Sequence, residues 1–135
     1  MRISPGRGGG VYLDNGSSPV IRNCVFENNM SGDDGGGLFA ATNSSPDVWY
    51  TRFEGNLATD RGGGACFAVN CFPEIIECDF VGNEAVNGGG LTFVYAYGPV
   101  IGSVFHDNTA TYGGGFHGYG NARCDFTACT FVGNT

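Results

Sequence analysis

Apolar and polar positions alternate in short stretches along this chain, and the same stretches return every 25–27 residues. Each repeat begins with three glycines and continues into a short apolar stretch, as at residues 11–13 and 91–93. Alternation over so few positions is typical of β-strands that bury one face. The pattern therefore predicts short strands joined by turns.

Three markers keep the same phase through five units. The glycine triplets begin at Gly8, Gly35, Gly62, Gly88 and Gly113, so the spacings are 27, 27, 26 and 25. A Phe-x-x-Asn motif recurs with the phenylalanines Phe26, Phe53, Phe80, Phe105 and Phe131 and the asparagines Asn29, Asn56, Asn83, Asn108 and Asn134. A proline precedes the phenylalanine by seven residues at Pro19, Pro46 and Pro73 and by six at Pro99, and the fifth unit has Cys124 there. Residues 1–135 are therefore expected to form a single repeat domain without linkers.

The length of the unit selects the fold class. Helical repeats need 33 residues or more and disfavour internal glycine, and leucine-rich repeats need several leucine columns, which four leucines cannot supply. A β-solenoid of about five coils remains, with one unit per coil. A second apolar column follows the proline, at Ile21, Val48, Ile75, Val100 and Phe126. The alternation changes phase between this column and the phenylalanine, which predicts a bend and three strands per coil.

Equivalent residues of successive coils should stack about 4.8 Å apart, so each marker becomes a ladder. The five phenylalanines of the Phe-x-x-Asn motif are expected to stack in the interior. The five asparagines are expected at a turn, because asparagine tolerates left-handed backbone and its amide can bond the next asparagine. The glycines need positive φ or close backbone approach. All three ladders are interpreted as structural, because a repeated residue is the packing rule of a solenoid.

The repeat resembles a known family. Gly89-Gly90-Leu91 and Phe80-Val81-Gly82-Asn83-Glu84-Ala85 resemble the repeats of chlamydial polymorphic outer-membrane proteins and, more broadly, the right-handed parallel β-helix of the pectin-lyase-like superfamily. The resemblance covers residues 8–134 and implies a right-handed, all-β parallel helix. It also implies adhesion or surface display as part of a longer secreted array. The chain is accordingly expected to be a fragment of such an array.

The six cysteines do not form an obvious disulfide framework. Cys24, Cys78 and Cys129 share one column two residues before the phenylalanine, two coils apart, which is about 9.6 Å and too far for a disulfide. They are expected to point inward as small apolar groups. Cys66 and Cys71 lie in one coil, and the sequence allows a disulfide between them across a turn. No metal site is expected, because neither cysteine spacing nor His106 and His117 suit zinc.

Pectin-lyase-like folds include polysaccharide lyases and glycosidases, so catalytic candidates were sought on outward positions. Glu77 and Asp79 flank Cys78, and Tyr50 and Arg52 occupy the same columns one coil earlier. Two carboxylates at a suitable separation serve glycoside hydrolysis. The alternative is an ordinary cross-strand charge pair between Arg52 and Asp79. No cofactor is implied.

Charge and aromatic content bear on partners. The formal charge is −7, with six arginines, no lysine and thirteen acids, which disfavours nucleic acid and anionic membranes. No apolar run is long enough to span a bilayer. Glu27 over Glu54 is a like-charge stack that would attract Ca²⁺, as would Asp33 with Asp34; the favoured alternative for both is an ordinary solvated acidic face. Trp49 and Tyr50 are the main candidates for a carbohydrate- or protein-binding surface; the other aromatic candidates are Tyr95, Tyr97, Tyr112 and Tyr119.

The sequence thus predicts a non-enzymatic structural or adhesive segment of a secreted or cell-surface protein. A carbohydrate-active β-helix, either a lyase or a glycoside hydrolase, is the alternative. Residues 1–6 contain no apolar stretch like that of a signal peptide, so the export signal is expected outside this chain. Exposed strand edges at the two ends of the stack predict end-to-end self-association.

Overall fold

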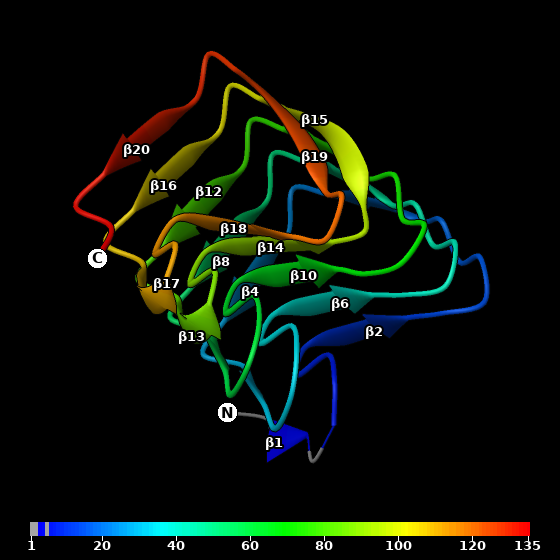
Figure 1. The fold of residues 1–135 in the computed structure, drawn as a ribbon, viewed down its shortest axis with the longest axis horizontal. Coiled ribbons are helices and arrows are strands. Elements are labelled where there is room, and N and C mark those ends of the chain that lie inside the picture. The colour runs from blue at the N-terminus through cyan, green and yellow to red at the C-terminus, as the bar shows by residue number, and fades with distance from the viewer. Residues whose placement is uncertain (1–2, 5) are drawn as a thin grey trace.

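The computed structural model describes residues 3–4 and 6–135 as a helical stack of coils built from four parallel β-sheets (Figure 1). Each sheet has five strands, and no described residue is helical. Residues 1, 2 and 5, which belong to the stretch considered for a signal peptide, lie outside the described residues. The parallel solenoid of about five coils is therefore confirmed.

Sheets A to D are named here by their strands. Sheet A contains β1 (Ile3–Ser4), β5 (Met30–Ser31), β9 (Leu57–Ala58), β13 (Glu84–Asn87) and β17 (Thr109–Tyr112). Sheet B contains β2 (Val11–Leu13), β6 (Leu38–Ala40), β10 (Ala65–Phe67), β14 (Leu91–Val94) and β18 (Phe116–Tyr119). Sheet C contains β3 (Val20–Arg22), β7 (Asp47–Trp49), β11 (Glu74–Ile76), β15 (Tyr97–Ile101) and β19 (Arg123–Thr127). Sheet D contains β4 (Val25–Glu27), β8 (Arg52–Glu54), β12 (Asp79–Val81), β16 (Val104–His106) and β20 (Thr130–Val132).

Each coil passes through sheets B, C, D and A, so the prediction of three strands per coil was wrong. The missed strand follows the ladder asparagine and is only two residues long in β5 and β9. Its inward residue is small, as at Ser31 and Ala58, which lie opposite each other in the ladder. A two-residue strand is too short to show alternation, so the hydrophobic pattern does not predict it.

The phenylalanine ladder lies in the interior as expected. Phe53, Phe80 and Phe105 are fully buried, and Phe53 and Phe80 stack with ring centroids 4.8 Å apart and 6° between planes. The ladder extends to Phe26 and Phe131 with the same parallel stacking, although Phe26 is half-buried and Phe131, in the last coil, is 46% exposed. These rings, with the apolar columns of sheets B and C, make one continuous core.

The asparagine ladder links every coil to the next. Asn83 donates its Nδ2 to Asn108 Oδ1 at 3.0 Å and to the carbonyl oxygen of Phe53 at 2.9 Å, and its Oδ1 accepts from Asn56. Asn56, Asn83 and Asn108 are fully buried. The ladder predicted from the repeat is therefore present in the middle coils.

The two end members of the ladder differ from the three central ones in burial. Asn29 donates its backbone N–H and its Nδ2 to Asn56 Oδ1, at 3.0 Å and 3.1 Å, so it continues the ladder as predicted. Asn29 is nevertheless only half-buried, because no equivalent asparagine precedes it in the chain. Asn134 accepts from the backbone N–H and the Nδ2 of Asn108 and is also half-buried.

The prediction of left-handed backbone at the ladder asparagines was wrong by one position. In the first coil φ is +53° at Asn28, and Asn29 itself does not have positive φ. The left-handed residue bends the chain at the corner between sheets D and A, and the side chain of the next residue points inward to the ladder. The same position, directly before each ladder asparagine, has positive φ in all five coils: Asn28, Gly55, Gly82, Asp107 and Gly133.

The glycine triplets meet both of their expected requirements. The first glycine has positive φ, as Gly62 does at +63°, and it covers the outward side chain of the following strand. The second lies against the backbone of its neighbours: a Cβ on Gly63 would be 2.4 Å from the carbonyl oxygen of Glu84 and 2.5 Å from that of Gly89. Adjacent coils can approach this closely only where no side chain intervenes.

The predicted bend lies between sheets C and D. Five residues there have left-handed backbone, one in each coil: Asn23, Tyr50, Glu77, Gly102 and Ala128. The next column carries small thiols and hydroxyls that fasten the corner, as where the Cys78 backbone N–H donates to Ser103 Oγ at 3.0 Å. The thiol of Cys78 in turn donates to the carbonyl oxygen of Val48 at 3.2 Å. The left-handed column, which includes the candidate site residues Tyr50 and Glu77, is a requirement of the fold.

The differences in unit length are absorbed in the turns between sheets. Asn83 follows Asn56 by 27 residues, whereas Gly88 follows Gly62 by 26, so one residue is lost between sheets A and B. Another is lost between sheets B and C, because β14 pairs with β10 at a spacing of 26 and β15 pairs with β11 at 25. The ladders keep their register throughout.

All six cysteines are free. The bridge between Cys66 and Cys71 is not formed, because the two thiols lie in different packing clusters. Cys66 lies on the outer side of sheet B against Phe39 and Val94, whereas Cys71 belongs to the interior. Cys78 points inward as expected, while Cys24, in the first coil, is exposed.

Candidate functional site

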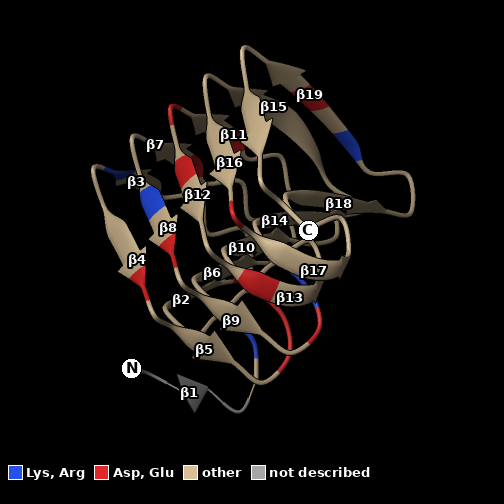
Figure 2. Cartoon of the chain, turned by 90° about the vertical axis from the view of Figure 1, so that its left-hand side faces the viewer, with Lys and Arg blue, Asp and Glu red and all other residues tan. Residues whose placement is uncertain are grey.

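The outer face of sheet D carries an ion-pair network that joins three coils. Arg52 lies opposite Asp79 in the ladder and contacts its carboxylate, and Arg52 Nε donates to Glu54 Oε2 at 2.8 Å. The imidazole of His106 approaches Asp79 from the next coil, with Nε2 3.6 Å from Oδ1. Figure 2 shows the blue segment of β8 beside the red segment of β12. Asp79 thus lies between two basic side chains.

This network is accessible to water. The side chains of Arg52, Glu54 and Asp79 are 40%, 42% and 32% exposed. The hydrogen bond from Arg52 lowers the pKa of Glu54, and the same bond together with the charge of Asp79 raises the pKa of Arg52. Exposed ion pairs of this kind contribute between 0 and about 1 kcal/mol each.

The catalytic candidates do converge on one shallow hollow of about 370 Å³, which is lined in part by Tyr50, Arg52, Glu77 and Asp79. The two carboxylates of this hollow make different contacts. The carboxylate of Asp79 is held in an ion pair with Arg52, and that of Glu77 leans toward the next coil, where a Cβ on Gly102 would lie 2.7 Å from Oε1. A glycosidase needs one carboxyl as proton donor and a second that is free to act as base or nucleophile. The geometry corresponds to the cross-strand charge pair that the sequence also allowed.

His106 completes this network, and sequence reasoning missed it. The residue was weighed only as a zinc ligand. Its contact with Asp79 is diagonal, because Asp79 pairs with Val104 and His106 pairs with Val81. Diagonal neighbours become visible only when the register of the strands is known.

The two aromatic binding candidates follow each other in the chain and differ in exposure. Trp49 is half-buried on sheet C, and its indole Nε1 is buried with no hydrogen-bond partner among the described residues. Tyr50 is 53% exposed at the corner, with the guanidinium carbon of Arg22 6.0 Å from its ring centroid. One face of the Tyr50 ring is therefore already covered by a guanidinium group.

A second hollow of about 720 Å³, called here the sheet C groove, lies over the start of sheet C. It is lined by Asp47, Phe72, Pro73, Glu74, Tyr97, Gly98, Pro99, Arg123 and Asp125. Two columns along the axis form it. One is acidic, with Asp47 opposite Glu74 and Asp125 opposite Pro99, and the other holds Tyr97 opposite Arg123.

The rings of the sheet C groove are exposed although they touch. Phe72 is 53% and Tyr97 37% exposed, and their centroids are 4.8 Å apart at a tilt of 46°. Among the described residues, none of the carboxylates of Asp47, Glu74 and Asp125 forms an ion pair. The groove therefore combines apolar ring faces with unpaired negative charge.

Sequence analysis anticipated only part of this groove. Tyr97 was among the aromatic candidates, but Phe72 was not, because it precedes Pro73 outside any strand. The usable signal was the pairing of Phe72 with Tyr97 at a spacing of 25 rather than 27. That spacing follows from the two lost residues, one between sheets A and B and one between sheets B and C.

Three acidic side chains gather where the coil turns from sheet A to sheet B. Ligand oxygens of Asp33, Asp34 and Asp60 lie within 4.8 Å of one another, as a cation site would require. Two arginines already approach them: Arg7 Nε is 2.9 Å from Asp33 Oδ2, and an Arg61 nitrogen is 3.5 Å from Asp60 Oδ2. The cluster is therefore compensated by protein charges.

Asp34 is the buried member of this cluster. It is 2% exposed, its Oδ2 lies 3.4 Å from Arg7 Nε and 3.7 Å from an Arg61 nitrogen, and its Oδ1 has no partner among the described residues. Burial raises the pKa of Asp34 to about 6, the charges of Asp33 and Asp60 add to this shift, and the two arginines oppose it.

This shift predicts a pH-dependent stability. The folded chain binds the Asp34 proton more tightly than the unfolded chain, so its stabilising effect is complete below about pH 4 and is lost as the pH rises through 6. Asp34→Asn should remove up to about 3 kcal/mol of this decline between pH 4 and 7. Urea unfolding at several pH values measures it. Glu27→Gln, an exposed carboxylate elsewhere, should keep the wild-type slope, and an unchanged slope in Asp34→Asn would contradict the assignment.

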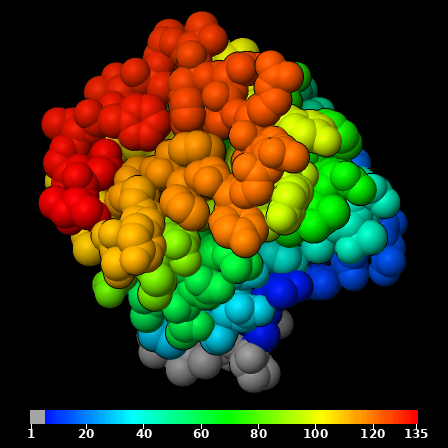
Figure 3. Space-filling view, viewed as in Figure 1, coloured from blue at the N-terminus to red at the C-terminus, as the bar shows by residue number. Residues whose placement is uncertain are grey.

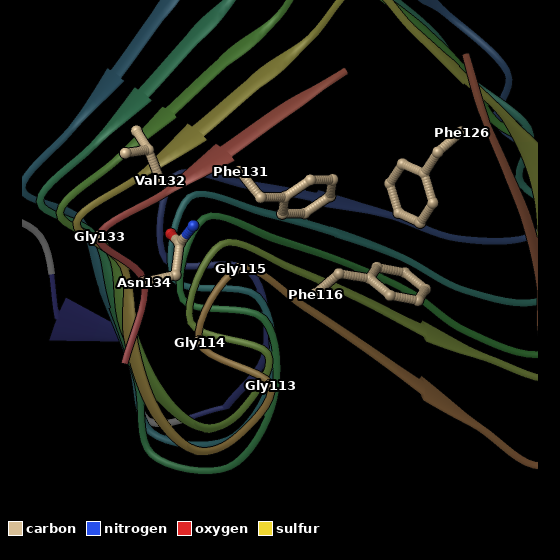
Figure 4. A pocket seen from close by; sticks show the side chains of 9 residues that line it. All are labelled: Gly113, Gly114, Gly115, Phe116, Phe126, Phe131, Val132, Gly133 and Asn134. Atoms are coloured by element: carbon tan, nitrogen blue, oxygen red, sulfur yellow. The ribbon is translucent and has the colours of Figure 1, made fainter. Parts of the chain in front are cut away.

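A third hollow, of about 490 Å³, lies at the C-terminal end of the stack (Figure 4). Phe116, Phe126 and Phe131 point toward it, beside the glycines of the last triplet. The same columns are buried in the preceding coils, and Figure 3 shows the final coil, in orange and red, covering this end. The hollow is lined by no acid, base or nucleophile.

Parallel sheets, aligned ladders and uniform coils define a parallel β-solenoid as the class of this protein. The sequence matches, over residues 1–135, the family described as the right-handed beta helix region. The chain therefore belongs to the right-handed β-helix family. No curated protein and no solved structure matches it. Among the described residues, no helix is long and apolar enough to cross a membrane.

Proposed function

We propose that this chain is a non-enzymatic structural and adhesive segment of a secreted or cell-surface protein. The observation that carries the proposal is the sheet C groove. Its rings, Phe72 and Tyr97, stand outside the buried ladders, where the packing of the coils does not require them. Exposed apolar patches with a polar rim are typical of interaction sites. The resemblance of the repeats to those of surface proteins supports the proposed secreted or cell-surface location.

Attachment of chain-coated beads to defined surfaces tests this proposal. Beads carrying the wild-type chain should be retained on at least one of three surfaces: immobilised neutral glycans, a basic protein layer or an acidic protein layer. Tyr97→Ser combined with Phe72→Ser should reduce retention several-fold, because both substitutions remove exposed ring area and leave the core intact. Equal retention of wild type and variant on every surface would contradict adhesion through this groove.

The carbohydrate-active alternative has its own measurement. The convergence of Glu77, Asp79 and Arg52 on one hollow is the observation in its favour. Release of reducing ends or unsaturated products from polysaccharides, abolished in Glu77→Gln, would establish it. With Asp79 held by Arg52 and His106, we expect no release above that of Glu77→Gln.

A further inference from the structure

The sheet C groove carries uncompensated negative charge. Asp47, Glu74 and Asp125 contribute three carboxylates, and within the described part of the chain Arg123 is the only cationic residue that lines it. Arg7, Arg52 and Arg61 are engaged in ion pairs elsewhere, so they do not balance these acids. The whole chain is also negative, at −7. A partner that enters this groove gains from carrying positive charge.

The carboxylates are arranged in a line rather than a cluster. Asp47 and Glu74 are ladder neighbours, about 4.8 Å apart along the axis, and Asp125 follows Glu74 two coils later, at about 9.6 Å. Among the described residues, the only group of three close enough to hold one metal ion is that of Asp33, Asp34 and Asp60, outside this groove. The spacing therefore favours several cationic groups on one chain over a single ion.

The neighbouring column suits the same ligand. The rings of Phe72 and Tyr97 lie beside the carboxylates and are 53% and 37% exposed. Aromatic faces attract ammonium and guanidinium groups and also pack against their aliphatic stems. In an extended peptide, side chains on one face recur about every 6.8 Å, and flexible lysine or arginine side chains can reach carboxylates spaced as these are.

We propose that the sheet C groove binds a basic, extended peptide segment of a partner protein. This inference rests on the proposed adhesive function and names the partner of its groove. Each cationic side chain pairs with a carboxylate of a different coil, and the rings of Phe72 and Tyr97 cover the stems. A neutral glycan would pack on the rings but bring no positive charge to the three carboxylates.

Fluorescence anisotropy with a labelled peptide of alternating lysine and threonine tests the inference. The wild-type chain should bind it, and raising the salt concentration should weaken binding, because exposed charges are screened. Glu74→Gln combined with Asp125→Asn should weaken binding about tenfold, which corresponds to about 1.4 kcal/mol. Phe72→Ser should weaken it about threefold, as expected for the loss of one ring contact.

The matched control removes the same charge elsewhere. Glu27→Gln combined with Glu84→Gln, on sheets D and A, should change the affinity by less than about twofold, since it alters only the distant field. Equal weakening in both double variants would show unspecific attraction to an acidic chain and overturn the inference. Binding of cellohexaose but not of the basic peptide would also overturn it while leaving adhesion intact. Binding of neither, with no bead retention, would overturn both.

Discussion

Asn83→Ala is expected to lower the free energy of unfolding by about 3–5 kcal/mol, since each buried group left without its partner costs about 1–3 kcal/mol. The amide of Asn83 makes four hydrogen bonds, two as donor and two as acceptor, with Phe53, Asn108 and Asn56. Alanine leaves the Phe53 carbonyl and the Asn56 backbone N–H without these partners in a fully buried place. Chemical denaturation followed by circular dichroism measures the loss.

Asn121→Ala provides the comparison for this ladder prediction. Asn121 is exposed beyond β18, so the same chemical change there should alter stability by less than about 0.5 kcal/mol. Asn83→Asp keeps an acceptor for Asn56 but loses the donor to Asn108, so it should also destabilise strongly. Similar unfolding midpoints for Asn83→Ala and Asn121→Ala would refute the ladder as a main source of stability.

Gly63→Ala is expected to prevent the native stack from forming, or to cost more than about 4 kcal/mol. Its Cβ would lie 2.4 Å and 2.5 Å from the carbonyl oxygens of Glu84 and Gly89, and both belong to backbone that cannot yield without breaking the ladder. Costs above 4–5 kcal/mol are exceptional for one substitution and need a mechanism such as this overpacking. Soluble yield and far-ultraviolet circular dichroism report the outcome.

Gly6→Ala separates this clash from a general intolerance of alanine. A Cβ on Gly6 would meet nothing within 4 Å, and its backbone is not left-handed. This variant should fold and melt like the wild type. A Gly63→Ala protein with native spectrum and melting temperature would show that the coils are further apart than described here.

The repeated columns were predictable because the same residue type recurs at the same position in each of the five units. Phe80 and Asn83 identify the interior and a turn only together with their equivalents in the other coils, and the family match agrees with that interpretation. Sheet A was missed because a strand such as Leu57–Ala58 is too short to alternate. The residue with positive φ lies one position before the predicted one. Glycine and asparagine both tolerate left-handed backbone and both occur there, as at Gly82 before Asn83 and at Asn28 before Asn29, so the sequence alone does not distinguish the two positions.

The candidate sites were less predictable, because their contacts run between coils. Arg52 and Asp79 were paired correctly from the period alone, since both occupy one column. The contact from His106 to Asp79 is diagonal, and the contact from Phe72 to Tyr97 depends on a two-residue change in spacing. Such contacts need the register of each individual coil, which an average repeat length does not contain.

Because length changes are confined to the turns, the exposed turn between sheets B and C in the last coil can accept foreign segments. Gly120 and Asn121 lie there, between β18 and β19. A segment grafted at this point would project from the side of the rod, and the asparagine and phenylalanine ladders would continue beneath it unaltered. Such a scaffold can acquire new recognition loops coil by coil, each at a height along the rod set by the number of coils below it.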